Sequence, residues 1–100
     1  MSEARVWAPP LLWGPWADVW TRFGVVGPDK RNHRSTINID FRSLSQAPSA
    51  FAIEIDDGER VYRREGPGSY RLVLLGNTAL SVRVRCKSHS LGQNIEVTAG

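Results

Sequence analysis

The sequence is poor in cysteine, and it contains no long apolar run. Cys86 is the single cysteine, so no disulfide can form within the chain and the fold depends on packing and hydrogen bonds. Pro9, Pro10 and Pro15 interrupt the apolar stretch near the start, which argues against a secretory signal peptide. No stretch approaches the roughly 18 apolar residues that span a bilayer. We therefore expect a water-soluble protein that is assembled inside the cell and has no membrane partner.

Residues that could hold a metal ion or perform catalysis are equally scarce. The two histidines, His33 and His89, have no His or Cys at metal-ligand spacing. Asp56, Asp57 and Glu59 lie close together, but the remaining ligand positions of a calcium loop are missing. Neither a glycine-rich phosphate loop nor a nucleophile elbow occurs. We expect no catalytic residue, no metal and no cofactor, and therefore no enzyme.

Positive charge is in small excess and is carried mostly by arginine. Thirteen Lys and Arg against ten Asp and Glu give a net charge of +3, which is weak support for a nucleic-acid partner. Arg83, Arg85 and Lys87 alternate along one predicted strand and form a basic row that could contact phosphates. We favour pairing with carboxylates of neighbouring strands, because charged outer faces are normal on sheets. The carboxylates expected to pair are Glu54, Asp56 and Glu96.

From residue 35 onward, apolar and polar residues alternate as in half-buried strands. Asp57-Gly58 and Gly76-Asn77 are turn signals, and each predicts a hairpin between the strands that flank it. Residues 72–75 are apolar on both faces, which predicts a central strand covered by the N-terminal segment. The predicted strands cover residues 36–42, 51–56, 60–64, 70–75, 79–87 and 94–98. The pattern predicts an all-β protein, an antiparallel β-sandwich (jelly-roll or Ig-like) of six to eight strands.

All four tryptophans lie within the first 20 residues, in a segment broken by prolines. Each can bury roughly 150–250 Å², so together they carry too much apolar surface to stay in water. Residues 16–23 fit the apolar stripe of a short helix, whereas residues 19–26 fit a strand, which we favour because of the valines. We assign residues 1–18 to an extended N-terminal Trp/Pro-rich arm and residues 19–100 to a single β-sandwich domain.

The tryptophans can be covered in two ways, and the sequence leaves both open. They can close one end of the chain's own sandwich, or they can dock into a neighbouring subunit. The prolines keep the arm from joining a sheet along its whole length, so our hypothesis places the arm partly on other subunits. The candidate partner-binding residues are Trp7, Leu11, Leu12, Trp13, Trp16, Trp20, Arg31 and Arg34. An alternative function is a carbohydrate-binding β-sandwich module that stacks exposed aromatic rings on sugars.

The segments FAIEIDDGERVYRREGPGSYRLVLLGNTALSVRVRC (residues 51–86) and GQNIEVTAG (residues 92–100) carry a resemblance to a known class of proteins. Their tight hairpins and arginine-rich outer faces resemble the small β-sandwich structural proteins of tailed-phage virions, such as capsid decoration, neck and tail-associated proteins. The likeness covers roughly the C-terminal half. It implies a non-enzymatic virion component, assembled in the host cytoplasm, that docks through its N-terminal arm as a homo-oligomer or within a larger assembly.

Overall fold

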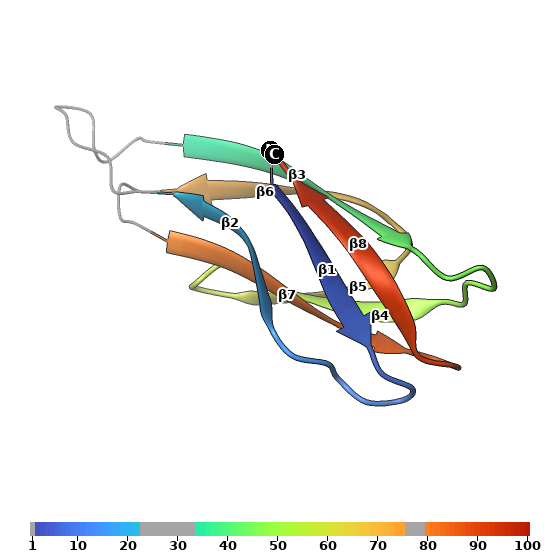
Figure 1. The fold of residues 1–100 in the computed structure, drawn as a ribbon. Helices are drawn as coiled ribbons and strands as arrows, with labels where there is room; N and C mark the ends of the chain where they lie inside the picture. Colours follow the sequence, from blue (N-terminus) through green and yellow to red (C-terminus); the bar gives the residue numbers. More distant parts are fainter. Residues whose placement is uncertain (1, 23–33, 76–79) are drawn as a thin grey trace, which may run out of the picture.

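Eight β-strands make up most of the protein in the computed structural model, which describes residues 2–22, 34–75 and 80–100 (Figure 1). They form two antiparallel four-stranded sheets with the strand orders β1-β8-β3-β6 and β2-β7-β4-β5. The strands are β1 (Ser2–Ala8), β2 (Ala17–Arg22), β3 (Arg34–Ser43), β4 (Phe51–Asp56), β5 (Val61–Gly66), β6 (Gly68–Leu75), β7 (Leu80–Ser88) and β8 (Gln93–Ala99). The prediction of an all-β, antiparallel two-sheet protein is confirmed.

One hydrophobic core lies between the sheets. Every second residue of a strand points inward and contributes its side chain to this core. In β7 the inward residues are Val82, Val84 and Cys86, while the basic residues between them face out. Phe51 and the isoleucines of β4 meet this layer from the neighbouring strand. The remaining core residues come from both sheets: Val6, Ala8, Val19, Ile37, Ile39, Phe41, Leu72, Leu74, Ile95, Val97 and Ala99. The apolar residues that alternate in the sequence therefore form a single buried layer between the two sheets.

The hairpin predicted at Asp57-Gly58 is present between β4 and β5, where Asp56 pairs with Val61. The Asp57 carboxylate accepts hydrogen bonds from the backbone N–H groups of Glu59 (2.9 Å) and Arg60 (2.7 Å). Gly58 has a φ of 96°, a conformation that favours glycine because it has no Cβ. The local turn chemistry thus determines this connection, which among the described strands is the only one between consecutive strands of the same sheet.

The hairpin predicted between residues 70–75 and 79–87 is wrong. β6 pairs with β3, whereas β7 lies between β2 and β4 in the other sheet, and the Gly76-Asn77 turn falls outside the described residues. Both strands present an apolar face, and either sheet can bury such a face. Alternation in the sequence therefore predicts that a strand exists but leaves its partner undetermined.

The prediction that residues 72–75 form a covered central strand is also wrong. β6 is the last strand of its sheet, and the structure buries Leu72 and Leu74 but leaves Val73 40% exposed on the outer face. An apolar run of this kind is compatible with an edge strand when only one of its faces reaches the core. The N-terminal segment lies elsewhere, along β8 and β7.

The N-terminal arm assigned to residues 1–18 requires the clearest correction. Residues 2–8 form β1, which pairs with β8 along its whole length and buries Val6 and Ala8 in the core. β2 begins at Ala17 and pairs with β7, and Val19 is buried. The three prolines at positions 9, 10 and 15 all fall in the connection between these strands, so they remove no donor from either strand. The strand predicted over residues 19–26 is present as far as Arg22, and its remainder lies outside the described residues.

Substitution of Gly66 tests the packing of this core. A Cβ atom at Gly66 would lie 2.3 Å from the Phe51 ring and 2.9 Å from the Ile53 Cδ1 atom, and both side chains are fully buried. We expect Gly66→Ala to lower the free energy of unfolding by about 1–3 kcal/mol through overpacking, as measured by urea denaturation. Gly68→Ala is the matched control, because its nearest neighbour is the Tyr70 hydroxyl at 3.3 Å. Equal midpoints for the two variants would contradict this packing.

The reactivity of Cys86 reports on the same core. Its side chain is fully buried, and burial raises the pKa of the thiol to about 12. Only the thiolate reacts readily with disulfide reagents, so we expect labelling of the folded protein at neutral pH to be slow and limited by unfolding. Labelling should become fast in denaturant. Rapid labelling of the folded protein would show that β7 does not hold Cys86 in the interior.

Candidate interaction surface

The connection between β1 and β2 and the turn between β7 and β8 meet at the same end of the sandwich (Figure 1). The Ser88 N–H donates to the Pro9 carbonyl oxygen (3.0 Å), and the Leu11 N–H donates to the Ser88 carbonyl oxygen (2.8 Å). Further along, the Gly14 N–H donates to the Cys86 carbonyl oxygen (3.0 Å). The connection therefore crosses from one sheet to the other while remaining hydrogen-bonded to the end of β7.

Four exposed large apolar side chains come from the end of β1, the β1–β2 connection and the β7–β8 turn, and we call them the apolar tip. Trp7 is 46% exposed, Leu11 71%, Leu12 69% and Leu91 78%. The Trp7 indole packs over Gly92, where a Cβ atom would lie 2.6 Å from the ring, so it lies beside the residue that follows Leu91. Exposed apolar surface gathered at one end of a protein is a candidate contact surface, and the backbone hydrogen bonds at Ser88 bring the segments that carry these side chains together.

A buried polar network holds the backbone beneath the apolar tip. The Gln93 side-chain amide donates to the Ser49 carbonyl oxygen (3.0 Å) and to the Ser88 hydroxyl (3.1 Å). The Ser43 hydroxyl donates to the Gln93 amide oxygen (2.5 Å), and the Ser88 hydroxyl donates to the Leu91 carbonyl oxygen (2.6 Å). Satisfied buried networks rigidify the segments that they join. The turn carrying Leu91 is therefore held in a defined position by the adjacent connection and strand ends.

Leu11 adopts a backbone conformation that is costly for its type. Its φ is 59°, in the left-handed region, where a residue with a Cβ atom is disfavoured by roughly 1–2 kcal/mol. Its side chain is also largely in water, so the isolated protein gains little from a leucine here. Strained residues of this kind concentrate where a contact with another molecule uses them.

Trp13 and Trp16 lie over the basic row on the outer face of β7 rather than at the tip. The Arg85 guanidinium stands 5.1 Å from the Trp13 ring centroid and 4.6 Å from that of Trp16. Arg83 lies 4.7 Å from the Trp16 centroid, and the Lys87 ammonium lies 4.9 Å from that of Trp13. Cations at such distances over indole faces attract the rings and shield them from water. We call these five residues the cation–indole layer.

Two carboxylates of β4 neutralise part of the cation–indole layer. Glu54, which is buried, accepts from Arg63 (3.0 Å) and Arg85 (2.6 Å), and Asp56 accepts from the Arg83 Nε–H (2.9 Å). The basic row is thus largely paired across strands, as expected for Glu54 and Asp56. Glu96 differs from the expectation, because it lies in the other sheet and its carboxylate pairs with Arg42 (2.6 Å).

These contacts change the proton affinity of both carboxylates. Burial raises the pKa of Glu54, but the hydrogen bonds and charges of Arg63 and Arg85 together outweigh it, so the pKa lies below the ordinary 4.5. The backbone N–H of Gly58 donates to the Asp56 carboxylate and, with Arg83, holds its pKa below the ordinary 3.8 despite partial burial. Both groups are therefore ionised at neutral pH, and their charges stabilise the fold.

The predicted partner-binding residues divide among several places. Trp7, Leu11 and Leu12 are exposed together at the tip, whereas Trp20 is half-buried against the chain's own core. Trp13 and Trp16 are half-buried in the cation–indole layer. Arg31 lies outside the described residues, and Arg34 begins β3 at the end opposite to the tip, where its backbone pairs with that of Leu75.

Sequence reasoning missed Leu91, Ser88 and Gln93. Leu91 is the single apolar residue in the polar link Ser88-His-Ser-Leu-Gly92, and that isolation was the one available signal. The roles of Ser88 and Gln93 depend on segments about 40 residues away meeting them in space, which no local pattern reveals.

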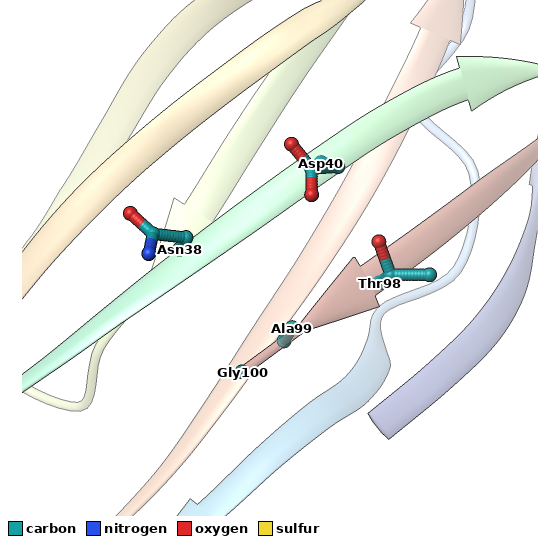
Figure 2. Close-up of a pocket in the computed structure, with 5 residues that line it drawn as sticks. All are labelled: Asn38, Asp40, Thr98, Ala99 and Gly100. Atoms are coloured by element: carbon teal, nitrogen blue, oxygen red, sulfur yellow. The ribbon is translucent and has the colours of Figure 1, made fainter. Parts of the chain in front are cut away.

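The sheet that contains β3 and β8 carries a small pocket on the side of the sandwich away from the cation–indole layer. Asn38 and Asp40 of β3 and Thr98 of β8 border it, together with Ala99 and Gly100 (Figure 2). The Asp40 carboxylate accepts a hydrogen bond from Ser69.

In residues 2–22, 34–75 and 80–100, no three His, Cys, Asp or Glu side chains gather as metal ligands would. The same ranges contain no helix with the length and apolar character needed to cross a membrane.

The paired Glu54 makes stability depend on pH in a defined direction. Because its pKa is lowered on folding, its ionised form stabilises the protein above pH 4.5, and this contribution disappears as pH falls through the lowered value. We expect Glu54→Gln to cost about 1–2 kcal/mol at neutral pH and almost nothing in acid, where wild-type Glu54 is protonated too. Urea denaturation across the pH range measures this. Glu65→Gln, which removes the exposed partner of His89, is the control and should change little at neutral pH.

Comparison with known proteins found no protein similar to this chain. No family model matches the chain, and neither the search of curated proteins nor that of solved structures found a match.

Proposed function

We propose that this protein is a non-enzymatic structural subunit that docks on neighbouring subunits through the apolar tip, as a phage virion component of the capsid-decoration, neck or tail type. The observation that carries the proposal is the exposure of Trp7, Leu11, Leu12 and Leu91 at one end of the sandwich. Docking gives these side chains the cover that their own fold does not provide.

The energetics favour use of the tip in a repeated assembly. Full burial of a leucine side chain contributes roughly 1.5–3 kcal/mol, so the tip supplies several kcal/mol for each copy. A single association also loses at least about 4 kcal/mol of translational and rotational freedom, which leaves one isolated contact weak. Many copies on one shell or tube share that loss, so modest contacts hold an assembly firmly.

The fold and surface support the same proposal. We assign the sandwich to the jelly-roll class, because its eight strands divide four and four and its first and last strands are neighbours. Jelly rolls occur widely in viral capsid proteins. The buried free Cys86 fits assembly in the reducing host cytoplasm, where disulfides are rare. The paired charges of β4 and β7 give little support to nucleic acid as the partner.

A carbohydrate-binding module is the second candidate, and Trp7 favours it. The half-exposed indole lies on β1 directly opposite Asn94 of β8, so an aromatic surface and an amide are placed side by side for sugar contact. Trp13 and Trp16 add no stacking surface, because Arg83, Arg85 and Lys87 occupy positions over their rings. Titration with oligosaccharides while tryptophan fluorescence is recorded tests this candidate, and Trp7→Phe should abolish any quenching that occurs.

Substitution in the tip separates docking from folding. We expect Leu12→Asp combined with Leu91→Asp to leave the unfolding midpoint nearly unchanged, because both side chains are mostly in water already. The same double variant should lose the tip-dependent part of self-association, measured by light scattering over a concentration series. Leu11→Asn, which tolerates a positive φ, should weaken association without lowering stability.

Val61→Asp on β5 is the matched control, since Val61 is 55% exposed and belongs to a strand outside the tip. It should associate like the wild type. If the tip variants associate as strongly as the wild type, the protein does not dock through the apolar tip.

A further inference from the structure

The two sheets end in neighbouring edge strands along one side of the sandwich. β5 is the last strand of one sheet and β6 the last strand of the other, and Pro67 alone separates them in the chain. Within the part of the chain that the structure describes, no strand pairs with the outer edge of either. Unpaired N–H and C=O groups along such an edge are a template for another strand.

β5 carries features that block this pairing. Its register places Arg64 opposite Ile53, so Arg64 lies on the face of the sheet that carries the core residues. Arg64 is nevertheless exposed to solvent. Arg63 and Glu65 add charges on the other side of the strand. Inward-pointing charge and charged side chains are the means by which natural edge strands resist pairing.

β6 lacks these features. It is eight residues long, it pairs with β3 in an unbroken register, and Arg71 is its only charged residue. Leu72 and Leu74 point to the core and Val73 is 40% exposed on the outer face. A long, regular and mostly apolar edge of this kind favours addition of a strand.

We propose that β6 pairs with β6 of a second copy of this chain, antiparallel about a two-fold axis at Leu72, so that the two four-stranded sheets become one eight-stranded sheet. A strand beside itself in antiparallel orientation is the arrangement that two-fold symmetry produces. This interface is separate from the apolar tip and does not depend on the proposed function.

The register follows from the faces and from the one charge. Residues directly opposite in an antiparallel pair lie on the same face, so only registers that keep Leu72 and Leu74 on the core side are compatible with a continuous sheet. Two such registers pair seven residues of β6. One is centred on Arg71 and places this guanidinium opposite itself, which is unfavourable. The other, centred on Leu72, pairs residues 69–75 and places Arg71 opposite Val73 of the partner subunit.

The same register identifies a second copy as the occupant. Tyr70 and Leu74 of the two subunits then face each other on the core side, and the exposed Val73 is covered by the aliphatic stem of the partner's Arg71. The strand therefore complements itself in apolar pattern, and its one charged residue faces an apolar residue of the partner subunit rather than its own copy. One strand pair buries less than a standard interface, so the dimer forms with a concentration dependence that can be measured.

Charge substitutions at Val73 test the pairing and its register together. In the Leu72-centred dimer, Val73→Lys places an ammonium opposite Arg71 of the partner subunit twice, and Val73→Glu places a carboxylate there twice. We expect Val73→Lys to weaken dimerisation roughly tenfold and Val73→Glu to strengthen it, as measured by sedimentation velocity over a concentration series. The double variant Arg71→Glu with Val73→Lys, which again places opposite charges across the pair, should bring the affinity back to at least the wild-type value.

Control variants keep the test independent of folding and of the tip. Val61→Lys on β5 should dimerise like the wild type, and circular dichroism should show the same fold for every variant because Val61 and Val73 are already exposed. Leu12→Asp with Leu91→Asp should retain the dimer. A wild-type protein that is monomeric at every concentration, equal effects of Val73→Lys and Val73→Glu, or loss of the dimer in the tip variant would each overturn the proposal.

Discussion

The hydrogen bonds between the β1–β2 connection and the end of β7 are the contacts on which the rest of the structure depends. The Ser88 backbone bonds to Pro9 on one side and to Leu11 on the other, so the chain is held at β7 while it crosses between the sheets. This crossing allows β1 to extend one sheet and β2 the other. It also places Leu11 and Leu12 at the tip and carries Trp13 to the outer face of β7. A proline-rich segment suits this path, because it needs few donors of its own and is stiff.

The concentration of tryptophan in the first 20 residues has a physical explanation in this arrangement. Trp20 lies against the core, and Trp13 and Trp16 lie among cations, of which Arg83 and Arg85 are paired with carboxylates of β4. Each of these rings therefore has cover within its own chain. Trp7 is the exception, since it covers Gly92 yet stays half in water. The exposed apolar surface therefore contains less tryptophan than the sequence indicates, and most of its exposed side chains are leucines.

The two proposed contact regions, the apolar tip and the β6 edge, differ in the interactions on which they depend. The tip offers apolar side chains on turns that the Gln93 network holds in place, so its contact depends on burial and shape. The β6 edge offers backbone donors and acceptors, so its contact depends on register and symmetry. The tip lies at one end of the sandwich and the edge along one side. If both proposed contacts form, a subunit joined in two directions extends an assembly beyond a pair, which is the requirement for a shell or a tube.

The sequence by itself determined the strands from residue 34 onward, the β4–β5 hairpin and the inward position of Cys86, because alternation of period two and Asp-Gly turn chemistry are local properties. The sequence also indicated Trp7, Leu11 and Leu12 of the tip, because large apolar side chains next to prolines are visible in the sequence itself. Only the tertiary structure decided that β1 belongs to a sheet, that β6 is an edge, and that Trp7 packs over Gly92 in the turn that carries Leu91. These features depend on which strands pair, and pairing joins residues that are distant in the chain. An alternating strand buries its apolar face equally well against several partners, so local pattern leaves that choice to the packing of the whole domain.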